Sequence, residues 1–529
     1  MTELPQQKKS FFRREFIYLL VAVIAVAILG IGIVLQLNPK PAKLQGAGYV
    51  EGLPKDKVTV AVLEQVGGLY PNTTFDVDSI AINGSVFDGL TIFRNGKVQP
   101  GLAESWTNPD ELTWKIKLRS GVKFHSGNPL KASDVKYTIE ETKKHLDWFS
   151  GIASSIASKV DSVEVIDDQT LELKTKNPDP TLLHWMIYLY IFSEDQVKKD
   201  GLEKAVGTGP YELVSIDKKE AVLKANDAYW GGPPKVKSLV YKAYKDARAI
   251  ADGFEKGEVD ISLFLENAYN EGLKNKGFRV IPAKSGDISF LGFNTKMAPF
   301  TDVRVRKAIL LALDVNKILK GSDRDGQPAT QFATADLTGF NKELTQPKTD
   351  KAEAKKLLTE AGLADGFTVT LNILETGEKI AEQIKNELAE IGITVKPNPL
   401  GFDEYFDKAP KAAFYFLSYV PDTLDSTDLL NSFVHSRTAD KGGFNFSRYS
   451  NPKLDELLDK ASTTFNTNER AKIIEQAHKE IMDQLPLVPL MERINFFVLR
   501  EDVSFKPAAF GLIFGFELSG RQKATDATQ

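Results

Sequence analysis

Few side chains in this sequence of 529 residues are arranged for catalysis. Cysteine is absent, which removes disulfides, thiolate metal sites and cysteine nucleophiles. The five histidines are His125, His145, His184, His435 and His478, and none lies within four residues of another, so there is no zinc site of the HExxH type. A GxSxG nucleophile elbow and a P-loop are also missing from the sequence. These absences count against the commonest kinds of enzyme active site.

Three other patterns could carry chemistry, and each has a simpler structural reading. Gly207–Tyr211 is rich in glycine, but the strand-like run YELVSI continues from it, so we expect a turn and not a phosphate cradle. His184 stands beside Trp185 in an apolar stretch and is expected to be a packed histidine, because a metal site needs several converging ligands. The 71 acidic residues could include a glycosidase pair, yet nothing singles out two of them.

The N-terminal segment predicts a membrane anchor. Phe16–Leu37 is a run of 22 residues without a charge, and about 20 apolar residues suffice for a helix to cross a bilayer. Lys8, Lys9, Arg13 and Arg14 precede it and predict that residues 1–15 stay in the cytoplasm. A cleaved signal peptide is the alternative, with weak cleavage sites near Ala47 and Gly48. Residues 38–56 are predicted to be a linker, and a lipid anchor on cysteine is excluded.

The charge of the rest of the chain excludes one class of partner. The net charge is −4, and residues 1–44 hold six basic and two acidic residues, which leaves 61 basic and 69 acidic residues elsewhere. A mildly acidic body has no electrostatic footprint for nucleic acid.

The elements of this body indicate an α/β architecture, because strand-like runs alternate with amphipathic helical patterns. Predicted strands cover residues 57–63, 114–118, 122–124 and two runs within 161–174 that are separated by a turn at Asp167-Asp168. Predicted helices are one capped by Asp302, one starting at Pro452, one starting after Thr349 or Asp350 and ending at Gly362, and a short one through Leu102 and Trp106. Residues 367–399 read as strand, helix and strand, which predicts a βαβ crossover.

Several segments, in order along the body, resemble the peptide- and nickel-binding proteins of ABC importers, known as solute-binding protein family 5. These segments are VFDGL (86–90), PGLAESWTNPDELTWKIKLRSGVKFHSGNPLKASDVKYTIE (100–140), GTGPYEL (207–213), ANDAYWGGPPKV (225–236), ARAIADGFEKGEVDI (247–261), LGFNTKMAPFTDVRVRKAILLALD (291–314), NFSRYSNPKLDELLDKA (445–461) and LPLVPL (485–490). They are spread over most of the body, so the resemblance is specific.

The resemblance implies a two-lobed fold like that of periplasmic binding proteins, with an extra small domain and the ligand in the cleft between the lobes. Lobe I would take residues 57–80, 205–285 and 495–522, the small domain residues 81–204, and lobe II residues 286–494. Two crossing segments would join the lobes, and closure about this hinge would bury the ligand.

The resemblance also suggests ligand-binding residues. Peptide-binding members hold the peptide's amino terminus with an aspartate in a G-W-x-x-D-like segment, and Ser418-Tyr419-Val420-Pro421-Asp422 matches it with serine and tyrosine in place of glycine and tryptophan. Asp422 would then bind the ammonium group by a charge-assisted hydrogen bond. A turn role for Asp422 stays open, and Asp425 and Asp428 compete with it. Tyr419 could be a cleft wall or part of the core.

Other candidates come from the same resemblance. Phe293 and Asn294 would lie near the hinge, where Asn294 could line the cleft or satisfy backbone groups. Residues 75–78, with Val77 and Asp78, match a loop that touches peptide. His435 is the best candidate for a nickel ligand, although no partner ligands are visible.

We therefore expect an extracytoplasmic, membrane-anchored, monomeric binding protein that delivers a peptide-like solute to the permease subunits of an ABC importer, without a cofactor, a metal or catalysis. A nickel-chelate or other solute receptor of the same family and an anchored ligand sensor are the alternatives.

Overall fold

The computed structural model describes residues 49–523 except 64, 67–68, 70, 73–76, 95–96, 146–150, 264–266, 323, 421–422, 424, 439–440 and 507–512. The chain divides into two compact units, and the one considered below is Glu51–Arg521. Of the other unit, only residues 49–50 and 522–523 are described. The predicted anchor, Phe16–Leu37, lies outside the described residues. No helix in the described part is long and apolar enough to span a bilayer.

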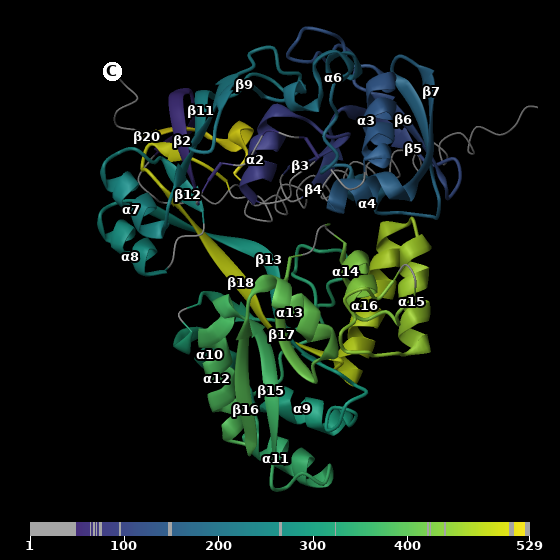
Figure 1. Ribbon diagram of the computed structural model, residues 1–529, viewed down its shortest axis with the longest axis vertical. Coiled ribbons are helices and arrows are strands. Elements are labelled where there is room, and N and C mark those ends of the chain that lie inside the picture. Colours follow the sequence, from purple (N-terminus) through teal and green to yellow (C-terminus); the bar gives the residue numbers. More distant parts are fainter. Residues whose placement is uncertain are drawn as a thin grey trace, which may run out of the picture. The chain divides into compact units, whose positions relative to one another are not determined.

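One large mixed sheet runs through the unit (Figure 1). Its eleven strands follow the order β16-β15-β17-β13-β18-β12-β2-β11-β10-β9, with β14 paired to β18 outside that path. The two long central strands, β13 (Arg279–Phe293) and β18 (Leu487–Leu499), pair antiparallel from Arg279↔Leu499 to Gly292↔Leu487. The register of this pairing shifts between Lys284 and Ile288 and again between Ser289 and Phe290. These strands therefore belong to both halves of the sheet and are the two crossing segments that the resemblance implied.

On one side of the crossing, strands from three distant stretches build the core of lobe I. β2 pairs in parallel with both β11 and β12, and β12 pairs with β18. Val58, Val60, Tyr211, Leu239 and Phe497 are among the buried side chains that fill this core. The elements are β1 (Tyr49–Leu53), β2 (Lys55–Leu63), α2 (Val77–Val86), β9 (Tyr211–Ile216), β10 (Glu220–Ala225), β11 (Val236–Tyr244), α7 (Ala247–Glu255), β12 (Ile261–Leu263), α8 (Asn267–Asn275), β19 (Val503–Ser504), η5 (Gly515–Glu517) and β20 (Ser519–Lys523).

The small domain has a separate four-stranded sheet and its own core. This sheet has the order β5-β6-β8-β7 and is entirely antiparallel. Trp114 is 4% exposed and Ile116 is fully buried on β6, so Trp114 belongs to the core. The elements are β3 (Thr91–Arg94), β4 (Lys97–Pro100), β5 (Ala103–Thr107), β6 (Thr113–Leu118), α3 (Ala132–Lys144), α4 (Gly151–Lys159), β7 (Val160–Asp167), β8 (Thr170–Thr175), α5 (Leu182–Trp185), α6 (Glu194–Asp200) and η1 (Leu202–Lys204).

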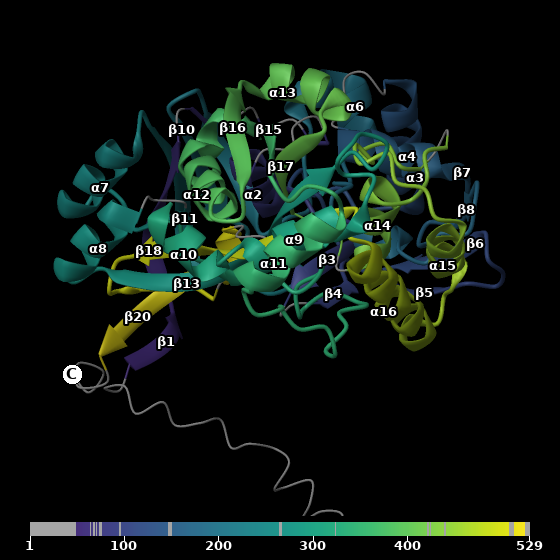
Figure 2. The same ribbon diagram turned by 90° about the horizontal axis from the view of Figure 1, so that it is seen from below.

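Lobe II lies on the other side of the crossing and has apolar cores on both faces of its sheet. Alternate residues of β17 face the two cores: Phe414 and Phe416 join one, and Tyr415 and Leu417 join the other. The elements are α9 (Val303–Ala312), α10 (Val315–Gly321), β14 (Gly326–Pro328), α11 (Lys351–Glu360), β15 (Phe367–Leu374), η2 (Glu375–Gly377), α12 (Glu378–Ala389), β16 (Ile393–Leu400), α13 (Phe402–Lys408), η3 (Ala409–Lys411), β17 (Phe414–Tyr419), α14 (Ser426–Phe433), α15 (Pro452–Thr463) and α16 (Thr467–Gln484). Figure 2 shows β15, β16 and β17 side by side with α12 next to them.

Most of the predicted elements are confirmed. Asp302 caps α9 by accepting a hydrogen bond from the Arg304 backbone, and Asp350, the second of the two candidates, caps α11. Asn451 precedes Pro452 as the N-cap of α15. β15, α12 and β16 form the predicted unit with its strands in parallel.

Two predictions were wrong. Residues 103–107 form β5 and not a short helix, because Trp106 pairs with Ile116 of β6 and this ladder decides the conformation. The stretch 122–124 is not a regular strand but makes a single bridge between Lys123 and Pro129. The predicted domain boundaries stay a prediction, but α2 and residues 190–197 pack largely with the lobe I core.

A substitution on β13 tests the close packing at the crossing. A Cβ on Gly292 would overlap the ring of Tyr415, its fully buried register partner on β17. Gly292→Ala should therefore lower the free energy of unfolding by about 1–3 kcal/mol, as overpacked cores do. Chemical denaturation measures this loss. Gly272→Ala in α8 is the control, because its Cβ would meet no atom within 4 Å. An equal effect of the two substitutions would contradict the packing described.

Candidate functional site

The segment predicted to bind ligand begins where β17 ends. Ser418 pairs in register with Ser289 of β13, and their hydroxyl oxygens are 2.7 Å apart. Tyr419 is half-buried and packs its ring edge-to-face on Phe433, with 4.9 Å between ring centroids. Both side chains are therefore held at the place where β13 crosses between the two halves of the sheet. Pro421, Asp422 and Leu424 lie outside the described residues.

Asp425 has a structural role that occupies its carboxylate. It caps α14 by accepting a hydrogen bond from the Thr427 backbone at 3.0 Å, and it also accepts one from the Thr427 hydroxyl at 2.6 Å. Arg470 of α16 donates to its other oxygen at 2.8 Å, and the two side chains are 0% and 2% exposed. Because this ion pair is fully buried, removing either partner would leave an uncompensated charge. Asp425 is thus engaged and does not compete with Asp422 in this conformation.

Asp428 contacts the small domain. The Thr181 hydroxyl oxygen lies 3.4 Å from one carboxylate oxygen of Asp428, and the Thr423 hydroxyl oxygen lies 3.3 Å from the same oxygen. Thr181 in turn is held by Asp179, whose second oxygen makes an ion pair with Lys159 at 2.9 Å. Burial raises the pKa of Asp428 to about 6, and Lys159 opposes this rise.

We call this set of groups the bridging cluster: Lys159, Asp179 and Thr181 of the small domain with Thr423, Asp425, Asp428 and Arg470 of lobe II. His184 lies within reach of its charges. Burial lowers the pKa of His184, the charge of Asp425 raises it, and the charge of Arg470 lowers it. His184 is half-buried within the small domain, where its neighbours Leu183 and Trp185 belong to the core. The bridging cluster includes Thr423 and Asp425, which are the two described residues between Asp422 and the start of α14.

The structure places the other candidate residues differently from one another. Phe293 is fully buried and stacks on Phe414 with 5.4 Å between centroids, so it belongs to the core of lobe II and offers no surface to a ligand in this conformation. Asn294 is 6% exposed and accepts a hydrogen bond from the Lys296 backbone at 3.1 Å. Of its two alternatives, it therefore takes the one in which it satisfies a backbone group. Val77 and Asp78 open α2, and Asp78 is half-buried.

His435 is held by protein groups. Its Nε2 lies 3.2 Å from Asp459 and its Nδ1 lies 2.7 Å from the Ser436 carbonyl oxygen. Over the described residues, no group of three or more His, Cys, Asp and Glu side chains is placed to hold a metal ion. Gly207–Tyr211 leads into β9 as expected, with the Gly209 backbone donating to Val86.

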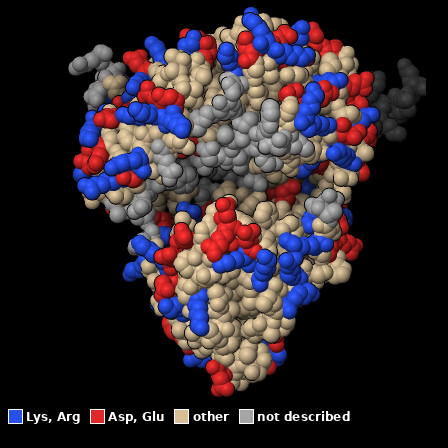
Figure 3. All heavy atoms as spheres, in the orientation of Figure 1, with Lys and Arg blue, Asp and Glu red and all other residues tan. Residues whose placement is uncertain are grey.

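A hollow crosses the middle of the face in Figure 3, and Lys and Arg side chains are intermingled with Asp and Glu over that face.

Sequence reasoning missed Lys159, Thr181 and Arg470, since each acts through a partner far away in the sequence. The only local signal was the density of aspartates in DTLDSTD (422–428).

These features define the class of two-lobed α/β binding proteins. Two crossing strands join the two halves of the large sheet, and a third, small domain makes a polar contact with lobe II. Residues 97–441 match the model of the bacterial extracellular solute-binding proteins, family 5 (middle region). This match covers well over half of the chain, and the protein belongs to that family.

Relatives and solved structures agree with this assignment. The chain is 26% identical to the dipeptide-binding protein of Escherichia coli over 82% of this chain and 87% of the relative. It is 27% identical to di/tripeptide-binding protein 1 of Pseudomonas aeruginosa (90% and 97%), and 26% identical to heme-binding protein A of Haemophilus influenzae (83% and 88%). Its fold is similar to that of HbpA2 from Haemophilus parasuis, with a TM-score of 0.80 at 24% identity over 88% of this chain and all of that one.

The pKa of Asp428 gives a test of the bridging cluster. Its ordinary value is 3.8, and the folded protein raises it to about 6, so the folded state holds this proton more tightly than the unfolded state. The stabilising effect of this proton is present below pH 4 and is lost as the pH rises to 6. The free energy of unfolding of the wild type, minus that of Asp428→Asn, should therefore fall by about 2 kcal/mol between pH 4 and pH 6.

Urea denaturation at several pH values measures this difference. Asp365→Asn, at an exposed position, is the control and should leave the difference independent of pH. Parallel curves for wild type and Asp428→Asn would mean that Asp428 is not buried in this contact.

Proposed function

We infer that this protein captures peptides or peptide-like solutes outside the cytoplasm and delivers them to the permease of an ABC importer. Family membership is the observation that carries this inference, and the named relatives that bind dipeptides and tripeptides support it. Capture, closure and docking break no bond in the ligand, so we propose a binding protein and not an enzyme.

We propose Asp422 as the partner of the peptide's amino group. Its competitor Asp425 is committed to Arg470 and to the cap of α14, and Asp428 is committed to Thr181 and Thr423. Ser418 and the bridging cluster fix the chain on either side of Asp422. A carboxylate in a closed cleft favours ligands that carry a free amine, because leaving its charge unpaired there is costly. Tyr419 and Ser418 would border the same site.

A peptide-binding measurement tests the role of Asp422. We expect the full-length protein to bind a short peptide at least about tenfold more tightly than the same peptide with an acetylated amino terminus, since one charge-assisted hydrogen bond is worth about 1.5–3 kcal/mol. Asp422→Asn should abolish this preference, while the exposed control Asp365→Asn should keep it. Isothermal titration calorimetry provides both dissociation constants. Equal preference in Asp422→Asn and wild type would exclude Asp422 as the ammonium partner.

The same titration separates the alternative ligands. A nickel chelate is the second candidate, but His435 is already bonded to Asp459 and Ser436. Haemin is a useful third probe, because one relative is named for binding heme. Binding of nickel chelate or haemin without any binding of peptides would overturn the peptide assignment.

We further propose that Phe16–Leu37 stays uncleaved and anchors a monomeric body on the outer side of the membrane. An anchored sensor that reports the ligand to a partner remains the alternative to import. The full-length chain should stay with membranes after alkaline carbonate extraction, because an apolar helix of this length resists release. N-terminal sequencing of the mature protein provides the contrary outcome, since a start after Leu37 would identify a cleaved signal peptide.

A further inference from the structure

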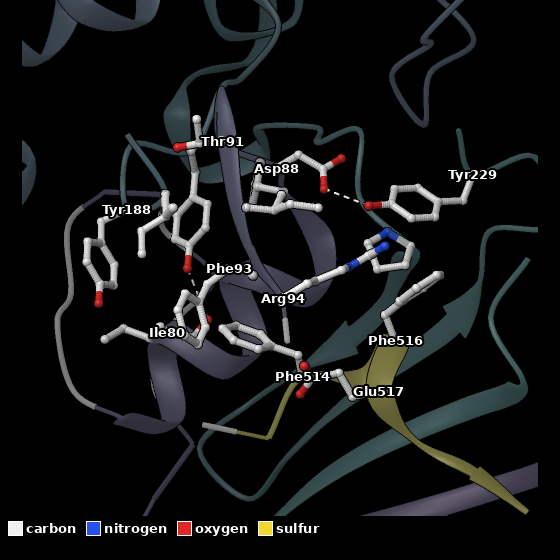
Figure 4. A pocket seen from close by; sticks show the side chains of 17 residues that line it. Ile80, Asp88, Thr91, Phe93, Arg94, Tyr188, Tyr229, Phe514, Phe516 and Glu517 are labelled. Atoms are coloured by element: carbon white, nitrogen blue, oxygen red, sulfur yellow. Dashed lines mark hydrogen bonds between the residues drawn. The ribbon is translucent and has the colours of Figure 1, made fainter. Parts of the chain in front are cut away.

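A pocket lies wholly on one side of the crossing of β13 and β18, between α2, β3 and the segment around η5 (Figure 4). It contains about 710 Å³ of space that no atom occupies, part of it open to solvent. All of its lining residues come from 80–94, 187–190, 210, 229 and 514–517, and none comes from lobe II. Closure of the lobes is therefore not needed to form it.

The walls of this pocket are mainly aromatic. Phe93, Tyr188, Tyr190, Phe514 and Phe516 contribute rings, and Ile80, Ile92 and Ile187 add aliphatic surface. Gly84 of α2 lets Phe514 approach closely, because a Cβ there would lie 2.6 Å from the Phe514 ring. Such walls suit an apolar or aromatic body, and ring faces also attract a cation.

Most polar groups of the pocket already have partners. Asp88 accepts hydrogen bonds from the Tyr229 hydroxyl at 2.9 Å, from the Thr208 hydroxyl at 2.9 Å and from the Trp230 indole at 2.8 Å. The Tyr190 hydroxyl donates to the Ile80 carbonyl oxygen at 3.2 Å. Neither Asp88 nor Tyr190 therefore needs a ligand.

Glu517 differs from these residues. Its Oε2 is buried and has no hydrogen-bond partner, which is costly for a carboxyl group. Arg94 is the nearby cation, but its guanidinium lies over the Phe516 ring, 4.0 Å from the ring centroid. Arg94 and Glu517 are both described, and no ion pair joins them. Figure 4 shows the Arg94 side chain extending toward Tyr229 while Glu517 lies beside Phe514.

The unpartnered oxygen of Glu517 indicates the chemistry of the missing partner. A carboxyl oxygen accepts hydrogen bonds and the ring faces of the walls attract a cation, so a charged amine donor suits both. We propose that this pocket binds a small primary amine with an aromatic or branched apolar body, whose ammonium group donates to Oε2 of Glu517 and whose body lies against the aromatic walls.

This site has a proton-linked signature. Burial raises the pKa of Glu517 to about 8, with Arg94 opposing the rise, so the free carboxyl is mostly protonated at pH 7. An ammonium ion favours the carboxylate, and binding should therefore release about one proton at pH 7. The affinity should rise about tenfold per pH unit up to pH 8 and level off above it, while the amine stays charged.

The experiment uses the full-length protein with two probes of equal shape, phenethylamine and phenethyl alcohol. Isothermal titration calorimetry at pH 7, in two buffers that differ in ionisation enthalpy, gives the affinity and the number of protons released. We expect saturable binding of the amine with release of about one proton, and binding of the alcohol at least about tenfold weaker. A saturating peptide should leave the amine binding unchanged.

Variants identify the place of binding. Glu517→Gln should lose at least about tenfold in amine affinity together with the proton release, whereas Glu343→Gln, an exposed control, should lose neither. A melting curve checks that Glu517→Gln is folded, and the proton count in the wild type tests the proposal without any variant. Absence of amine binding, binding without proton release, or loss of binding in Asp422→Asn but not in Glu517→Gln would each overturn the proposal. None of these outcomes depends on whether peptides bind.

Discussion

The pairing of β13 with β18 is the constraint on which the rest of the molecule depends. The two strands share a ladder from Arg279↔Leu499 to Gly292↔Leu487, so one pair of strands lies in the sheets of both lobes. β12 adds to this ladder on the lobe I side and β17 on the lobe II side. The register shifts between Lys284 and Phe290 loosen the ladder where it passes from one lobe to the other. We expect a hinge of two strands to let the lobes move while their cores stay intact.

The bridging cluster is the second link between these parts, and it differs from the hinge in chemistry. The hinge is backbone hydrogen bonding, whereas Thr181, Thr423 and Asp428 meet through side chains, beside the buried pair of Asp425 and Arg470. A polar contact of this kind is broken and reformed more easily than a ladder. It also holds Thr423 and Asp425, so the capture of a ligand that we propose for Asp422 would involve the same segment as the contact between the small domain and lobe II.

The local elements could be predicted from the sequence, and the long-range contacts could not. The cap at Asp302 and the unit from β15 to β16 depend on residues within one or two turns, and both were predicted. Residues 103–107 become a strand only because β6 pairs with them, and Phe293 is buried only because Phe414 and Phe300 pack on it. Arg470 meets Asp425 across 45 residues, and Thr181 meets Asp428 across 247, so no sequence pattern announces either contact. Glu517 was missed for the same reason, since its pocket joins the end of the chain to residues near its start.

Hydrogen–deuterium exchange of the full-length protein, with and without a short peptide, tests the central claim most directly. Capture of the peptide by the segment from Ser418 to the start of α14 should slow exchange in residues 423–430 and around Ser289. A smaller effect is expected at 179–185 through the bridging cluster. Backbone amides in β9, the end strand of the large sheet on the lobe I side, should be unaffected. Unchanged exchange at 423–430 under saturating peptide would contradict the account.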